Sequence, residues 1–295
     1  MLSADCYLMT EQELQQQRAI KWRTDGQAAR TTEDIRNFLE EVGFCMMYPL
    51  RSLPVLPTLF GAYAGSADGL PDAKHAFADP RTQPVTELMV RLLRERHAFE
   101  VSLFGDTSLL VSASLFPFFY ALLGDRNPKA VPKIKAQGAK ISPLGIKVFE
   151  AIQQSGPLSK GQLRELVGHE PAPAALDRAL NELWSILKIT RVNYRQEDGA
   201  FWDVLYRWAP KPIQKSINIS GPEAISALLS KYLEAVAAAD REEIEQLFSH
   251  LVPRQKIREA IHALQAAREL SFVAVGAKTL IRLTPVEEPR RRMNG

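Results

Sequence analysis

The sequence predicts a mainly α-helical protein with small β-hairpins (α+β), organised as tandem winged helix-turn-helix domains, three in all. Two observations carry this prediction. The spacing of apolar residues changes from three or four to two immediately after Lys188, which marks the passage from a helix to a strand. The same succession of helices and paired strands then recurs after about eighty residues, as in proteins built from repeated units.

The clearest unit occupies residues 140–215. A short helix follows Pro143, and the hydroxyl of Ser159 provides an N-cap for a second helix, "SKGQLRELVG". A third helix begins near Pro173. Its apolar residues recur every three or four positions and predict one buried face, made of Leu176, Ala179, Leu180, Leu183, Trp184 and Leu187.

A β-hairpin is expected after this helix. Residues 189–195 alternate between two faces, with Arg191 and Arg195 on one and Val192 on the other. The pair Asp198-Gly199 is expected to supply the positive φ angles of a tight turn. The expected return strand carries Trp202, Val204, Tyr206 and Trp208. Aromatic rings that alternate beside an apolar helix favour a place in the core over base stacking.

A second unit of this kind spans residues 220–285. Its first helix has apolar residues from Ile225 to Val236, its second is "REEIEQLFSHL", and its third begins at Pro253. Two strands, "SFVAV" and "KTLIRL", flank a turn at Gly276-Ala277. The prolines and the turns keep similar offsets in both units, because each unit needs similar helix lengths to bury one small core.

Residues 31–135 are expected to form a divergent third unit. The helices "TTEDIRNFLEEVG" and "VTELMVRLLRERH" each have one apolar face. Between them, the Pro- and Gly-rich span 49–84 is far longer than the usual loop of about four to six residues. Residues 1–30 are expected to be an N-terminal segment, and residues 286–295 a basic tail.

Composition excludes several classes of protein. Apolar residues make up 46% of the chain and charged residues 24%, which is too apolar for a mainly disordered protein. No stretch approaches the roughly 20 apolar residues that span a bilayer, and no signal peptide is recognisable. Cys6 and Cys45 have no partner at ligand spacing. We therefore expect a cytoplasmic, monomeric protein with no metal, no cofactor and no membrane contact.

The distribution of cations favours a nucleic-acid partner more than the net charge of +3 does. The segment from Arg126 to Lys147 has six cations and no acidic residue, which suits it to face phosphates. Arg254, Lys256 and Arg258 crowd a helix N-terminus, where the helix dipole disfavours cations, so we expect an anion nearby. The candidate contacts to double-stranded DNA are Arg51, Lys133, Lys135, Lys140, Lys160, Arg164, Arg178, Lys188, Arg191, Arg195, Arg254, Lys256 and Arg258.

Two long segments carry a resemblance to a known family. They are "LDRALNELWSILKITRVNYRQEDGAFWDVLYRWAP" and "FEVSLFGDTSLLVSASLFPFFYALL". The first is similar to the Leu-Trp helix, wing and ending of the AlkZ/YcaQ family of DNA glycosylases, and the second to that family's acidic-aromatic segment and Pro-containing helix. The likeness covers residues 31–283. It implies tandem winged helices that grip DNA, and removal of N7-alkylated or crosslinked guanines by cleavage of the base–sugar bond.

The chain departs from this family at the catalytic motif. The resemblance implies a Gln-x-Asp or Gln-x-Gln motif, which places a water molecule beside the developing sugar cation. The matching stretch here is "GFCMMYPLRS", in which no residue from Phe44 to Tyr48 has a carboxylate or amide side chain. The family's histidine is also absent from "FEVSLFG". We carry forward no catalytic residue; the conceivable substitutes are Glu40, Glu41 and Glu100.

Four hypotheses about function remain open. The leading one is a DNA-binding, repair-related member of this family that recognises duplex DNA and has lost the catalytic motif. An active glycosylase that uses substitute residues is the second, and a transcription regulator with tandem winged helices is the third. Winged helices also serve as protein-binding modules, which is the fourth. Salt dependence of DNA binding, release of a base and sequence preference distinguish them.

Overall fold

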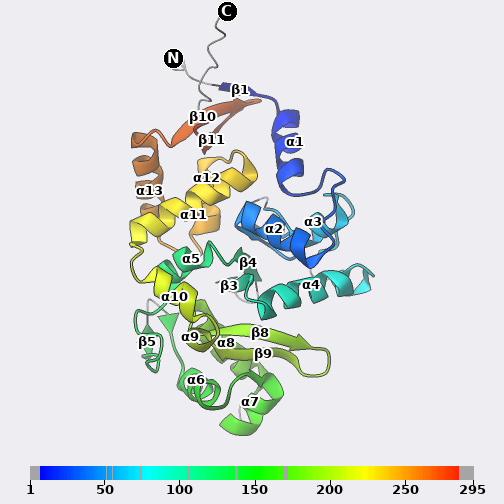
Figure 1. The fold of residues 1–295 in the computed structure, drawn as a ribbon. Helices are drawn as coiled ribbons and strands as arrows, with labels where there is room; N and C mark the ends of the chain where they lie inside the picture. The colour runs from blue at the N-terminus through cyan, green and yellow to red at the C-terminus, as the bar shows by residue number, and fades with distance from the viewer. Residues whose placement is uncertain are drawn as a thin grey trace, which may run out of the picture.

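The computed structural model describes residues 7–50, 52–54, 56–72, 75–104, 107–136, 139–168 and 172–285. Within these ranges the protein is mainly helical with small antiparallel hairpins, as predicted (Figure 1). One order of elements occurs three times: a helix, a short paired segment, two helices and a hairpin. We call residues 32–112 the first unit, 143–204 the middle unit and 221–283 the last unit.

The middle unit forms the elements that the sequence predicts. These are α6 (Pro143–Ser155), β7 (Leu158–Ser159), α7 (Lys160–Val167), α8 (Pro173–Ser185), β8 (Ile189–Arg195) and β9 (Gly199–Val204). Ser159 caps α7 in a reciprocal pair with Gln162. The hairpin register pairs Arg195 with Gly199, and Gly199 takes a positive φ of 72°. The turn is therefore one residue longer than the expected two-residue turn, and only its glycine needs positive φ.

The return strand is shorter than predicted. It ends at Val204, and Tyr206 and Trp208 lie in the short helix α9 (Leu205–Trp208), which α10 (Pro210–Ser216) follows. The amide of Leu205 donates to the carbonyl of Lys188, and its side chain is buried. A helix of four residues is too short to show a period of its own, so the alternation could not reveal where the strand ends.

The first unit has the same topology as the middle unit. Its elements are α2 (Thr32–Val42), β2 (Phe44–Cys45), α3 (Leu59–Ala64), α4 (Thr82–Arg94), β3 (Ala98–Phe104) and β4 (Thr107–Ser112). The strand order β2-β4-β3 matches the order β7-β9-β8 of the middle unit. The span 49–84, expected to be a long loop, contains α3 and the 3-10 helix η1 (Ala76–Ala78). Helix α3 is capped by Thr58 and stopped by Gly65 at a positive φ of 71°.

The last unit consists of α11 (Gly221–Val236), α12 (Arg241–Phe248), α13 (Arg254–Ala266), β10 (Leu270–Val275) and β11 (Lys278–Leu283). A two-bond bridge between Ala239 and Ile281 takes the place of the short strand. The N-terminal residues complete this unit: β1 (Tyr7–Met9) pairs in parallel with β10, and α1 (Glu11–Lys21) packs on α11. Buried Arg18 donates to the carbonyls of Val236 and Ala238, which fixes α1 in place.

The third helix of every unit ends in the same turn. Two residues after each helix, a non-glycine residue takes a left-handed φ between 53° and 60°. The next amide donates to the carbonyl five residues back, which is the hydrogen bond of a Schellman motif. The residues at the left-handed position are Arg96, Leu187 and Arg268. The bonds run from His97 to Leu92, from Lys188 to Leu183 and from Glu269 to Leu264. Three equal turns are independent support for the repeat.

The first and last units share one hydrophobic core. Phe44 of β2 stacks on Tyr232 of α11 with ring centroids 6.3 Å apart and meets Phe248 of α12 edge-on at 6.4 Å. Helix α5 (Phe116–Leu123), which follows β4, packs against α11 and adds Phe119 to this cluster. The middle unit has a separate core around Trp184. The first and last units therefore depend on each other for burial, whereas the middle unit has its own core and contacts the first unit through Trp184 and Arg191.

We expect Arg268→Gly to raise the free energy of unfolding by about 0.5–1 kcal/mol, because glycine adopts positive φ without a clash at Cβ. Arg268 is exposed, so little packing is lost. The matched control is Ala267→Gly, at φ −75°, where glycine should instead lower that free energy by about 0.5–1 kcal/mol. Urea titration measures both; similar losses in the two variants would contradict the strain at Arg268.

Candidate nucleic-acid interface

The cationic segment between α5 and the middle unit is held in place by one buried lysine. We call residues 126–147 the basic strap; it includes β5 (Lys135–Ala136), β6 (Ala139–Lys140) and the start of α6. The ammonium of Lys188 donates to three strap carbonyls and lies 2.8 Å from the carboxylate of Asp125. The three acceptors are Asn127 at 2.9 Å, Pro128 at 3.4 Å and Ala130 at 2.8 Å.

The structure therefore does not support Lys188 as a contact to DNA. Its side chain is only 1% exposed, and carbonyls and a carboxylate occupy its ammonium, so phosphate cannot reach it. The change in the spacing of apolar residues after Lys188 indicated where the helix ends. It could not reveal the carbonyls and the carboxylate that surround the Lys188 ammonium. Burial alone would raise the pKa of Asp125, but hydrogen bonds from Lys188 and from the Asn127 amide lower it.

The strap's own cations face solvent. Arg126, Lys129, Lys133, Lys140 and Lys147 are exposed, whereas the side chain of Lys135 lies outside the described residues. Gln153 of α6 donates to the carbonyl of Lys129 at 3.0 Å and adds a second fastening. The backbone of the strap is thus tied to the middle unit while its positive side chains remain available to an anionic partner.

The hairpin β8–β9 packs against the first unit, which changes the expected role of Arg191. Its guanidinium lies 2.8 Å from the carboxylate of Glu100 in β3 and 4.3 Å from the ring centroid of Trp184. Glu100 is 6% exposed, and its carbonyl accepts from the Trp184 indole. The charge of Arg191 is paired with Glu100 between the middle unit and the first unit. The structure therefore does not support Arg191 as a phosphate contact.

The exposed end of the hairpin keeps a cation. Arg195 is 64% exposed, lies over the Phe201 ring at 4.8 Å and is 3.8 Å from Asp198. Lys160 at the start of α7 pairs with Asp177 of α8 at 2.5 Å. Arg178 of α8 is exposed, and Arg164 of α7 is half-buried. Arg195 and Arg178 are thus exposed cations of the middle unit, whereas Lys160 lines the same cavity as Arg191.

The cations near the start of helix α13 have a carboxylate beside them, as expected. Glu245 of α12 accepts two hydrogen bonds of 2.7 Å from Arg258, and these bonds lower the pKa of Glu245. Lys256 pairs with Glu259 at 2.8 Å, and Arg254 is exposed. The expected anion is thus part of the protein, which leaves Arg254 as the most available cation of the three.

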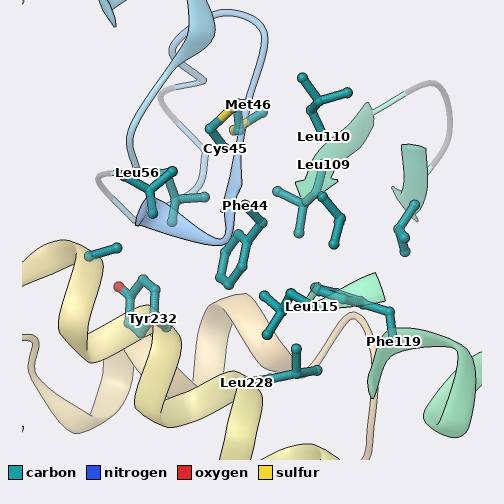
Figure 2. Close-up of a cluster of buried hydrophobic side chains, with 14 of the residues drawn as sticks. Phe44, Cys45, Met46, Leu56, Leu109, Leu110, Leu115, Phe119, Leu228 and Tyr232 are labelled. Carbon is teal, nitrogen blue, oxygen red and sulfur yellow. The ribbon is translucent and has the colours of Figure 1, made fainter. Parts of the chain in front are cut away.

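The stretch from Phe44 to Tyr48 lies in the shared core. Phe44 and Cys45 form β2 and pair with Val111 and Leu110 of β4. In Figure 2 the Phe44 ring extends from β2 toward Tyr232 of α11. Phe44, Cys45 and Met46 are at most 7% exposed. Burial raises the pKa of the Cys45 thiol, so the thiol stays protonated at neutral pH.

Comparison with known proteins places this geometry in a family. The family model described as "DNA glycosylase AlkZ-like" matches residues 71–293, which is more than half of the chain. The chain belongs to the AlkZ-like DNA glycosylase family. The resemblance stated from the sequence is thereby confirmed. The fold is also similar to that of the Streptomyces sahachiroi DNA glycosylase AlkZ, with a TM-score of 0.55 and 15% sequence identity over 91% of this chain and 70% of that one. No curated protein matches the chain.

The conceivable substitute acids of this AlkZ-like protein already have partners. Glu40 at the end of α2 accepts from the hydroxyl of Ser114, and Glu41 pairs with Arg23 at 3.1 Å. Glu100 accepts from Arg191 and from Ser108. Each carboxylate therefore already has a hydrogen-bond or ion-pair partner in this structure.

Arg51 and the tail cations Arg290, Arg291 and Arg292 lie outside the described residues. Among the described residues, every helix is too short or too polar to pass through a lipid bilayer. In the same part of the chain, no three His, Cys, Asp or Glu side chains gather to hold a metal ion.

We expect Lys188→Met to lower the free energy of unfolding by roughly 1–3 kcal/mol, because it leaves the part-buried strap carbonyls and Asp125 without their cation. Denaturant titration measures this loss. The control is Lys147→Met, an exposed strap lysine whose replacement should change stability by less than about 0.5 kcal/mol. Equal stability of the two variants would show that Lys188 does not hold the strap.

The Glu245–Arg258 pair should make stability depend on acid. The folded-state pKa of Glu245 is below its ordinary value of 4.5, so the pair stabilises the protein at neutral pH and this contribution is lost as pH falls through the folded pKa. The urea concentration at the midpoint of denaturation should therefore decrease less between about pH 5 and about pH 3 in Glu245→Gln than in the parent protein. An unchanged acid limb in the variant would contradict this assignment.

Proposed function

We propose that this AlkZ-like protein binds duplex DNA through phosphate contacts, in a role linked to DNA repair. Family membership supports DNA as the partner. The unit order of three helices and a hairpin supports winged-helix domains at residues 31–135, 140–215 and 220–285. In the middle domain the wing's first strand packs on the first domain, so only its turn is free for DNA.

The basic strap is the observation that carries this proposal. Its exposed cations are concentrated in one segment, while the net charge of the whole chain is only +3. The hydrogen bonds of Lys188 order the strap backbone when the protein folds. DNA binding therefore does not carry the entropic cost of ordering this backbone. Arg195, Arg178 and Arg254 are further exposed cations that can contact phosphates.

We further propose that the usual glycosylase chemistry is lost. Hydrolysis of a base–sugar bond requires an acceptor that fixes and polarises water. The stretch from Phe44 to Met46 supplies apolar side chains and one protonated thiol, all packed in the core. A carboxylate placed at Met46 would be buried in the apolar cluster, which is strongly unfavourable for an unpaired charge.

An active glycosylase is the alternative that family membership favours. Its water-activating group would have to be Glu40, Glu41 or Glu100, each of which would first have to leave its present partner. The buried Glu100 is the least able to do so, because Arg191 would be left as an unpaired, partly buried charge.

Replacing strap cations should weaken DNA binding and reduce its salt dependence. For the triple variant Arg126→Gln, Lys129→Gln, Lys133→Gln, the slope of log K against log salt should fall by about 0.9 for each phosphate that the protein no longer neutralises. Fluorescence anisotropy with a random duplex, measured at several salt concentrations, gives this slope.

The charge-matched control for that experiment replaces three solvent-accessible arginines of the N-terminal region: Arg30→Gln, Arg36→Gln and Arg91→Gln. The strap hypothesis fails when both triple variants reduce the slope equally. A large preference for one operator sequence over random duplex would instead indicate a transcription regulator.

Incubation with alkylated duplex DNA should release no base above the uncatalysed rate. Chromatography of the supernatant detects free alkylguanine directly. If base is released, Glu40→Gln and Glu100→Gln identify the substitute acid, and release would overturn the proposed loss of chemistry without affecting the strap hypothesis.

A further inference from the structure

The third helix of the last unit has an open outward face, whereas the third helices of the other two units do not. The three helices can be aligned on the left-handed residue of the turn that ends each of them. Six positions before that residue stand Val90 in α4, Asn181 in α8 and His262 in α13. Val90 is 8% exposed, Asn181 is half-buried, and His262 is exposed. In a winged helix the third helix is the element suited to the major groove of DNA, so this difference decides which unit can use it.

Contacts between units cover the first two of these helices. Helix α4 packs against β8, where Arg94 donates to the side chain of Asn193 at 2.6 Å. Helix α8 packs against β3, where the Trp184 indole donates to the carbonyl of Glu100. Neither helix can therefore lie in a groove along its full length, because a strand of the neighbouring unit already occupies part of its surface.

Helix α13 makes its main contacts within its own unit, with α11, α12 and β10. Its residues Gln255, Glu259, His262 and Ala266 are exposed, and their spacings of four, three and four put them on one face. This face has no large apolar side chain to anchor a protein partner. Its amide and imidazole groups can instead form hydrogen bonds with base edges, and the small Ala266 lets the helix backbone approach a groove closely.

The charge of α13 also favours an anionic partner. The helix has three cations, Arg254, Lys256 and Arg258, and one acid, Glu259. Glu259 accepts from Lys256 at 2.8 Å, and Glu245 of α12 accepts from Arg258 at 2.7 Å. Three cations against two carboxylates leave a positive balance at the start of the helix, where Arg254 is exposed. Cations in this place can neutralise the phosphates that border a groove.

The hairpin of the last unit is less suited to DNA than its helix. Strand β1 covers the edge of β10, so the hairpin is one side of a three-stranded sheet. Its turn lies beside α1: a side chain at Gly276 would come within 3.3 Å of the Glu11 carboxylate. An acid beside the turn repels phosphate, which leaves α13 as the part of this unit that can meet DNA.

We propose that α13 is the helix that enters the major groove of duplex DNA. Arg254 then contacts a phosphate at the border of the groove, and Gln255 and His262 face the base edges. This inference rests on the DNA binding proposed above and adds the element that holds the duplex. Figure 1 shows α13 and the strap strand β5 on the same side of the molecule and α1 on the opposite side.

Two acids added to the outward face test the proposal. In the double variant His262→Glu, Ala266→Glu, the affinity for a random duplex should fall about tenfold or more, because both carboxylates would face the anionic groove. Fluorescence anisotropy measures this affinity, and circular dichroism verifies that the variant is folded. The control is Gln12→Glu, Gln16→Glu, which adds the same charge at the same spacing on the exposed face of α1. Its affinity should change by less than about threefold, because solvent and salt screen distant charges.

A duplex with a blocked major groove identifies the groove that is used. Glucosylated 5-hydroxymethylcytosine places a sugar in the major groove and leaves the minor groove open. The parent protein should bind this duplex about tenfold more weakly than the unmodified one, because the helix cannot enter the groove. The α13 variant should bind the two duplexes with similar affinity, since its helix contact is already lost.

The possible failures are distinguishable. Equal affinities of the α13 and α1 variants for unmodified duplex overturn the proposal, and so does full-strength binding of the blocked duplex by the parent protein. In both cases the strap variants still test DNA binding through their salt slope. A parent protein that binds no duplex at all overturns the DNA-binding function and this inference together.

Discussion

The buried ammonium of Lys188 is the interaction on which the candidate interface depends. Its amide closes the turn after α8, its carbonyl accepts from Leu205 where the return strand ends, and its side chain holds the strap. It also lies over the Phe149 ring of α6 at 5.7 Å. One residue thus joins the helix, the hairpin and the strap, because a buried cation must find acceptors and the strap supplies them.

The cations of the chain divide into those used inside the protein and those left to solvent. Lys188, Arg191 and Arg258 hold elements together, each through a carboxylate on another helix, strand or loop. The strap and the hairpin turn keep exposed cations. Membership of the DNA glycosylase family rests on the family-model match and does not require a high net charge, and the stretch from Phe44 to Met46 is part of a core.

Local patterns were sufficient to predict the helices, the hairpins and their repetition, because periodicity and capping depend on residues that are near in sequence. They failed where distant residues decide. Lys188 and Arg191 look like surface cations until Asp125 and Glu100 are brought beside them by the fold. The end of the return strand at Val204 is likewise fixed by a hydrogen bond to Lys188.

The shared core of the first and last units has a consequence for biosynthesis. Phe44 and Phe119 emerge from the ribosome well before Tyr232 and Phe248, so the N-terminal portion must wait, with part of its apolar surface uncovered, until translation nears completion. The middle unit, which has its own core, can fold during that delay. The chain is thus expected to depend on chaperone protection early in its life, and truncation within α11 should leave an insoluble N-terminal fragment.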